Sequence, residues 1–165
     1  VRQGDRTLIV ALLACGWPNN KNYKWADMKT LVQYGLNQYG YCNYWEDAMQ
    51  DQDIRILEAG KKRTVKDAPA KDGNLYQDGT VNTFLNIDDQ DREKRILMKK
   101  TEAIQVQIEE KQEITAPIES GDILGTVTIL LNGETLDEKP IVSGESIQKK
   151  NLLWIYRQLW KSYAL

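Results

Sequence analysis

Residues 126–136 read Thr126-Val-Thr-Ile-Leu-Leu-Asn-Gly-Glu-Thr-Leu136. Val127, Ile129 and Leu131 recur at every second position, and this period of two predicts a half-buried strand. The pair Asn132-Gly133 follows at once, and both residues tolerate a positive φ, so the pair is typical of a two-residue hairpin turn. The stretch therefore predicts two antiparallel strands joined by a tight turn.

Strand and turn signals continue on the N-terminal side of this hairpin. Ile104, Val106 and Ile108 alternate with polar residues, and Ile54 and Ile56 flank Arg55, so strands are predicted in both places. Turns are predicted at Lys71-Asp-Gly73, Asp78-Gly79 and Ser120-Gly-Asp122. Short strands separated by turns every 8–12 residues or so predict a small antiparallel sandwich or barrel over residues 43–150.

The first 42 residues follow a different pattern. Leu8-Ile-Val-Ala-Leu-Leu13 is a continuous apolar run, which predicts a buried strand, and a loop is expected over 16–22. A helix is predicted from about Tyr23 to Tyr39, with Gly35 on its apolar face and Gly40 placed to end it. That face is formed by Trp25, Met28, Val32, Leu36 and Tyr39. A strand and one helix cannot make a core alone, so this segment needs partners.

The last 15 residues, 151–165, predict an amphipathic helix. At about 100° per residue its apolar side chains fall on one arc: Leu152, Leu153, Ile155, Tyr156, Leu159, Trp160 and Tyr163. From residue 149 onward the chain carries four cations, Lys149, Lys150, Arg157 and Lys161, and no anion, whereas the rest has 18 basic and 24 acidic residues. Such a tail predicts contact with an anionic membrane surface through all eleven of these side chains. The alternative is a helix packed on its own domain. The segment is shorter than the roughly 20 residues that span a bilayer.

Composition excludes several kinds of chemistry. The 165 residues hold no histidine, which removes Ser-His-Asp and Cys-His catalysis and most zinc sites. Cys15 and Cys42 lack the CxxC spacing of a metal site, so two buried thiols are expected, with a disulfide as the alternative. No phosphate-binding motif is present, and a net charge of −2 does not indicate nucleic acid. We predict no cofactor and no metal.

Two local motifs suggest chemistry that their surroundings do not support. Asp88-Asp-Gln-Asp91 is an acidic cluster without the glycine and terminal glutamate of a calcium loop, so a solvated turn is predicted. Ser146-Ile-Gln-Lys149 fits the S-x-x-K motif of serine–lysine acyltransferases, but no S-x-N or K-T-G accompanies it. We interpret this match as accidental.

Segments at both ends of the chain resemble one family, the D-alanyl-D-alanine carboxypeptidases, or low-molecular-mass penicillin-binding proteins. The strand, loop and helix of residues 7–35 resemble the end of the penicillin-binding domain, a fold shared with serine β-lactamases. Thr115-Ala-Pro-Ile118, Gly121-Asp-Ile-Leu-Gly125 and Lys139-Pro-Ile-Val142 resemble the family's small C-terminal β domain, and the terminal helix is similar to its membrane anchor.

The resemblance implies an α+β chain in three parts: the end of the catalytic domain over 1–42, a β stalk over 43–150, and a membrane-surface helix over 151–165. Members of the family cleave the terminal D-Ala of peptidoglycan stem peptides by acylating a serine. Their three catalytic motifs precede the part that this chain resembles, so no catalytic residue is assigned and the chain alone is expected to be inactive. Because it opens on Val1-Arg2-Gln3-Gly4, we expect a fragment or a processed form.

By the same resemblance, the protein is expected at the outer face of the bacterial cytoplasmic membrane. Its partners would be anionic lipid, peptidoglycan through the catalytic part, and an N-terminal fragment or catalytic domain. Two alternatives stay open. One is a non-enzymatic, envelope-associated adaptor or binding domain. The other is a carrier-type barrel, because residues 118–125 resemble the glycine turns of biotinyl and lipoyl domains, although the Asn132-Gly133 tip has no lysine.

Overall fold

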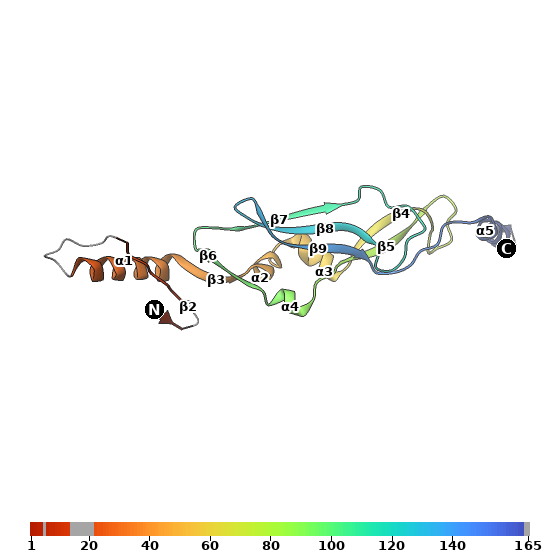
Figure 1. Cartoon of the computed structure of the whole chain (residues 1–165). Helices are drawn as coiled ribbons and strands as arrows, with labels where there is room; N and C mark the ends of the chain where they lie inside the picture. Colours follow the sequence, from red (N-terminus) through yellow and green to blue (C-terminus); the bar gives the residue numbers. More distant parts are fainter. Residues whose placement is uncertain (5, 14–21, 164–165) are drawn as a thin grey trace. The chain divides into compact units, whose positions relative to one another are not determined.

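The computed structural model describes residues 1–4, 6–13 and 22–163, and within them the chain forms two compact units (Figure 1). The first contains residues 1–42 together with 95–103, and the second contains residues 43–94 and 104–165. Strand β6 (Arg95–Lys99) therefore belongs with the first unit, although it lies inside the region predicted as one β domain. The division into domains at 42/43 and 150/151 stays a prediction.

The first unit is built around one long helix. Strands β1 (Arg2–Gln3) and β2 (Arg6–Thr7) form an antiparallel pair, α1 spans Tyr23–Gln38, and β3 (Tyr39–Asn43) pairs with β6 (Arg95–Lys99). The predicted helix is thus confirmed. Gly35 allows close packing as expected, since a Cβ at that position would lie 3.1 Å from Leu8 Cδ2. No described residue of α1 is buried, and Trp25 is 61% exposed.

The strand predicted over Leu8–Leu13 is wrong. Within the described part of this region, Arg6–Thr7 is the strand, and Leu8 exchanges backbone hydrogen bonds with Val1 (2.8 Å in both directions). Ile9 and Leu13 are 93% and 91% exposed. An apolar run becomes a buried strand only where neighbouring strands pair with its backbone, and within the described ranges none pairs with residues 9–13. The loop predicted over 16–22 lies outside the described residues except for residue 22, and the thiol expected at Cys15 also lies outside them.

The second unit contains a five-stranded antiparallel sheet, ordered β4-β5-β9-β8-β7. The strands are β4 (Lys61–Pro69), β5 (Asp78–Leu85), β7 (Ile104–Glu110), β8 (Ile123–Leu131) and β9 (Glu134–Ser143). The hairpin predicted at Asn132-Gly133 is confirmed, because these residues have φ of 54° and 85° and join β8 to β9, with Leu131 opposite Glu134. The strands predicted at 104–108 and 127–131 are also confirmed.

The sheet curls until its two outer strands approach each other. After β7 the chain crosses to β4, where Lys66 donates its backbone N–H to Ile114 O (2.8 Å) and accepts from Ala116 N (2.9 Å). Glu110 Oε2 lies 2.7 Å from Lys61 Nζ and 3.1 Å from Arg63 Nη1 of β4. The prediction of a small antiparallel β domain is therefore confirmed in its coarser form, a curled sheet. One cluster of buried side chains in this unit comprises Val65, Ala68, Val81, Ile114, Ala116, Ile118 and Leu124.

Three short helices accompany the sheet: α2 (Tyr44–Ala48), α3 (Gln52–Ala59) and α4 (Asp89–Arg92). The strand predicted at Ile54–Ile56 is wrong, because α3 occupies this position. Asp51 caps α3 by accepting from Asp53 N (2.8 Å), and Ile54 and Leu57, three residues apart, are buried together against the sheet. An alternation of only three residues fits a helix as well as a strand.

Two of the predicted turns are also wrong. Asp78-Gly79 begins β5, where Gly79 lies opposite Val65 of β4. Residues Asp88–Asp91 include most of α4, and Asp91 forms ion pairs with lysines instead of lying in solvent. The turns at Lys71–Gly73 and Ser120–Asp122 are confirmed, with φ of 78° at Gly73 and 92° at Gly121.

Candidate functional site

The terminal helix α5 spans Leu152–Tyr163, as predicted, and is firmly joined to the sheet at its start. Asn151 caps it, since its Oδ1 accepts from Trp154 N (2.8 Å). A bulge in β4 holds Asp67 at φ 60°, and the Asp67 carbonyl accepts from Lys150 N (2.8 Å). Lys150 Nζ donates to Gln77 O (2.8 Å) and lies 3.2 Å from Asp78 Oδ1. These contacts set the direction in which the helix leaves the sheet.

A polar side chain of α5 contacts the segment between β4 and β5, within the same unit. A Cβ added at Gly73, in the segment between β4 and β5, would lie 2.7 Å from Gln158 Oε1, so these two residues touch. Gln158 is half-buried, as are Trp154 and Ile155. Gln158 is not among the residues of the predicted apolar arc. Its contact with Gly73, 85 positions earlier in the chain, had no local signal.

The apolar arc of α5 is mostly exposed. Six of its seven predicted side chains form what we call the outer face, with exposed fractions from 42% to 85%: Leu152, Leu153, Tyr156, Leu159, Trp160 and Tyr163. The rings of Tyr156 and Trp160 stack at 6.3 Å. Together with Arg157 and Lys161 they line a shallow groove, so cations border the aromatic row. A soluble helix normally turns such a face toward a core, and this one does not.

The four predicted cations divide into two pairs. Arg157 and Lys161 are exposed on α5. Lys149 and Lys150 instead pair with acidic residues of the β domain, Lys149 Nζ lying 3.1 Å from Asp67 Oδ2. Among the described helices, none is long and apolar enough to cross a membrane.

A polar cluster centred on Asp137 joins α2 to β9. Asp137 Oδ2 accepts from Trp45 Nε1 (3.0 Å) and from the Tyr44 hydroxyl (3.2 Å). Lys94 and Lys139 lie 3.8 and 3.9 Å from the same carboxylate. Both lysines also pair with Asp91, whose carboxyl pKa is lowered by their hydrogen bonds. Every charge here has a partner of opposite sign, so the cluster stabilises the fold and offers no unpaired group for catalysis.

This cluster predicts a pH dependence of stability. Burial, reinforced by the charge of Asp137 and by its hydrogen bond, raises the pKa of Tyr44 from 10.0 to about 12. The folded state therefore keeps this proton where the unfolded state loses it, and its contribution to stability falls between about pH 10 and 12. Urea unfolding across this range should show a smaller loss of stability with pH in Tyr44→Phe than in the wild type. An equal loss in both proteins would contradict the assignment.

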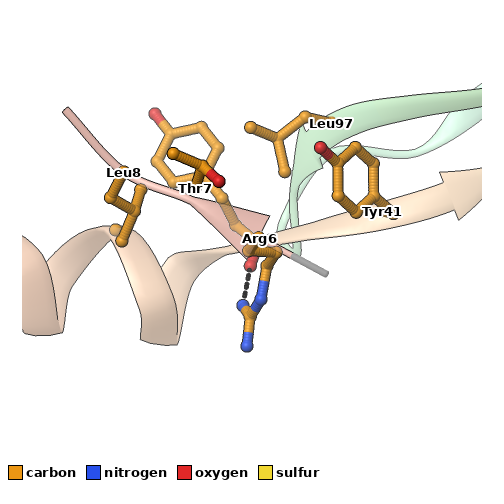
Figure 2. A pocket seen from close by; sticks show the side chains of 7 residues that line it. Arg6, Thr7, Leu8, Tyr41 and Leu97 are labelled. Atoms are coloured by element: carbon orange, nitrogen blue, oxygen red, sulfur yellow. Dashed lines mark hydrogen bonds between the residues drawn. The ribbon is translucent and has the colours of Figure 1, made fainter. Parts of the chain in front are cut away.

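The first unit contains a small pocket, shown in Figure 2. The Arg6 side chain points away from the other lining side chains (Figure 2). It donates to the backbone oxygens of Leu36 (2.8 Å) and Tyr39 (2.9 Å), which satisfies carbonyls at the end of α1. Its guanidinium is therefore occupied by the helix terminus. The pocket is lined by Arg6, Thr7, Leu8, Gly35, Tyr39, Tyr41 and Leu97. These residues include hydroxyl groups, but no carboxylate, lysine or thiol that could activate a hydroxyl as a nucleophile.

Ser146 and Lys149, which form the S-x-x-K match, each make a contact that stabilises the β domain. Ser146 lies in an irregular segment, and its Oγ accepts from Ser120 N (2.9 Å), while Lys149 pairs with Asp67. Cys42 lies half-buried in β3. Over the part of the chain that the structure describes, no group of three candidate metal ligands occurs.

The fold and this surface define a class of protein module: a small antiparallel β domain that carries a terminal helix with an exposed apolar face. The family model described as "Penicillin-binding protein 5, C-terminal domain" matches residues 89–149, from α4 through β9 to Lys149. This segment is similar to that domain, and the resemblance to the C-terminal portion of a low-molecular-mass penicillin-binding protein is confirmed to that extent.

Two solved structures are also similar to the chain. One is penicillin-binding protein 5 from Haemophilus influenzae, with 14% identity and a TM-score of 0.35 over 75% of this chain. The other is the D-alanyl-D-alanine carboxypeptidase DacD from Francisella tularensis, with 18% identity and a TM-score of 0.37 over 79% of this chain. The chain spans less than a third of either protein, 30% and 28%. No curated protein matches it.

Proposed function

We propose that these 165 residues are the C-terminal portion of a serine-type D-alanyl-D-alanine carboxypeptidase, and that they supply its stalk and its membrane anchor. The observation that carries this proposal is the family match over residues 89–149, in a domain that continues into a helix whose apolar face is exposed. The catalytic S-x-x-K, S-x-N and K-T-G set is not present as a group in this sequence, so the active site would lie in sequence outside it.

In this proposal α5 lies in the plane of the outer leaflet of the cytoplasmic membrane. The outer face would enter the boundary between headgroups and acyl chains, where Tyr and Trp side chains are favourable. Arg157 and Lys161, which border the aromatic row, would meet anionic headgroups. Lys149 and Lys150 would act indirectly, because their ion pairs with Asp67 and Asp78 hold the β domain to the start of the helix.

Residues 1–42 would be the end of the penicillin-binding domain. Ile9, Leu13 and Trp25 are largely exposed, and the backbone of residues 9–13 has no ladder partner among the described residues. Such a surface is what the remainder of a domain would cover. The curled β domain would then set the height of that catalytic domain above the membrane, close to peptidoglycan.

Labelling with a fluorescent penicillin tests the enzymatic part of the proposal. The chain alone is expected to stay unlabelled, because no S-x-N or K-T-G accompanies its S-x-x-K match in the sequence. Adding an upstream penicillin-binding fragment that carries S-x-x-K should give a labelled complex that sediments with anionic vesicles. A covalent adduct on a serine of this chain would contradict the proposal. A labelled fragment that never associates with the chain would favour the adaptor alternative.

A further inference from the structure

The segment that leads into α5 is bonded to the β domain close to the start of the helix. Ile147 exchanges backbone hydrogen bonds with Ile118, at 3.0 and 2.9 Å. Lys150 N donates to the Asp67 carbonyl (2.8 Å) immediately before the helix cap. Only two residues separate these backbone attachments, so the connection leaves little freedom for α5 to move independently of the sheet.

Asp67 bonds to this segment from an uncommon backbone conformation. Its φ of 60° lies in the left-handed region, which few non-glycine residues adopt. Among the described non-glycine residues, Asn132 is the other with a positive φ, and its hairpin turn accounts for it. Asp67 reaches the segment twice, through its carbonyl and through Oδ2, which lies 3.1 Å from Lys149 Nζ. A strained residue of this kind persists where the surrounding structure holds it, and here the attachment of α5 does so.

The Lys150 side chain joins the same place to the neighbouring strand. Its Nζ donates to Gln77 O (2.8 Å) and lies 3.2 Å from Asp78 Oδ1, which also accepts from Asp67 N (3.2 Å). The Lys150 side chain is only 18% exposed. Separating a cation this far withdrawn from water from its partners costs free energy. Because its ammonium already has these partners, Lys150 holds the helix to the domain instead of presenting its charge to a lipid headgroup.

We propose that Asp67, Asp78 and Lys150 form a rigid joint, which makes α5 and the β domain one body and so fixes the orientation of the stalk relative to the membrane. This inference rests on the proposed membrane role of α5. In it the outer face supplies the affinity for the bilayer, and the three residues of the joint act as positioning residues. A loose joint would leave the affinity nearly unchanged, but the stalk would then sample many angles to the bilayer.

NMR relaxation of the free chain tests the joint without a membrane. In the wild type the backbone amides of α5 should relax like those of β8 and β9, because a single body tumbles as a whole. Asp67→Ala removes the pair with Lys149 and strains the positive φ, so it should shorten the effective correlation time of α5 about twofold or more and leave that of the sheet unchanged. Lys150→Ala should loosen α5 in the same way. Asp67→Asn should stay close to the wild type, because asparagine also adopts the left-handed region.

The second readout is the motion of the β domain on vesicles of phosphatidylglycerol and phosphatidylethanolamine. A long-lifetime luminescent label at Glu134→Cys, in a full chain with Cys15→Ser and Cys42→Ser, reports this motion through its residual anisotropy. Asp67→Ala is expected to lower the residual anisotropy about twofold, while sedimentation with the vesicles changes by less than about twofold, because the outer face is intact. Glu138→Ala removes the same charge from an exposed position on β9 and, as the matched control, should change neither readout.

The outcomes separate the joint from the membrane role on which it rests. If the wild type binds vesicles but its α5 already tumbles independently of the sheet in the free chain, the membrane role stands and the joint is wrong. An unchanged anisotropy of Asp67→Ala on vesicles would overturn the joint equally. If the wild type does not bind anionic vesicles, the membrane role of α5 fails, and the orienting role of the joint fails with it. Lower anisotropy of Asp67→Ala at unchanged binding, restored in Asp67→Asn, supports the joint.

Discussion

The double change Leu153→Glu and Trp160→Glu is expected to lower the affinity of the chain for anionic vesicles about a hundredfold or more. Both side chains lie on the outer face of α5, seven residues apart, and are 59% and 67% exposed. Moving each side chain out of the membrane forfeits roughly 1.5 kcal/mol or more of apolar transfer free energy, and about 1.4 kcal/mol corresponds to tenfold in affinity. Vesicle co-sedimentation at fixed lipid concentration measures the change.

Arg157→Gln with Lys161→Gln is the matched control, because it also changes the net charge by −2 but removes little apolar surface. About 1 kcal/mol per cation near an anionic surface predicts a loss of roughly tenfold or somewhat more, which should shrink as salt screens the attraction. The loss caused by the glutamate pair should persist in part at high salt. If the two double variants behave alike at every salt concentration, then charge alone binds the chain, and the apolar face has no role.

Trp45→Ala is expected to lower the free energy of unfolding of the second unit by about 3–5 kcal/mol. The Trp45 side chain is fully buried, and its indole N–H donates to Asp137 Oδ2 at 3.0 Å. Its removal leaves a cavity beneath α2 and takes one donor from a carboxylate that is 13% exposed. Since a domain is stable by only about 5–15 kcal/mol, the variant should unfold at a much lower urea concentration. Circular dichroism follows the transition.

Trp160→Ala provides the comparison for this result within the same unit. The Trp160 side chain is 67% exposed, so the same substitution should change stability by less than about 0.5 kcal/mol. Equal destabilisation by the two alanine variants would mean that Trp160 packs in the core. The conclusion that the outer face of α5 is exposed would then be wrong.

The parts of the fold that sequence predicted well are those determined by local chemistry. The Asn132-Gly133 turn needs two residues with positive φ, and few other pairs provide them, so the hairpin could be placed within a residue. Sustained periods of two over residues 104–108 and of 3.6 over α1 and α5 likewise identified their elements. The terminal helix was found because seven apolar side chains fall on one arc.

The failures came where partners distant in sequence decide the structure. Leu8–Leu13 has the composition of a buried strand, but a strand needs neighbours, and the described residues do not supply them. At Ile54–Ile56 the alternation was too short to separate strand from helix, and Asp51, which caps α3, was the overlooked signal. The orientation of α5 depends on Gly73 and Asp67, more than 80 positions before Gln158 and Lys150, and no local pattern reports such contacts.

The central claim is that residues 151–165 attach the β domain to an anionic membrane surface. Co-sedimentation of the intact chain and of a chain ending at residue 150 with phosphatidylglycerol vesicles tests it most directly, with circular dichroism confirming that both are folded. We predict that the intact chain sediments with the vesicles and that the shortened chain stays in the supernatant. Equal sedimentation of the two folded chains would contradict the claim.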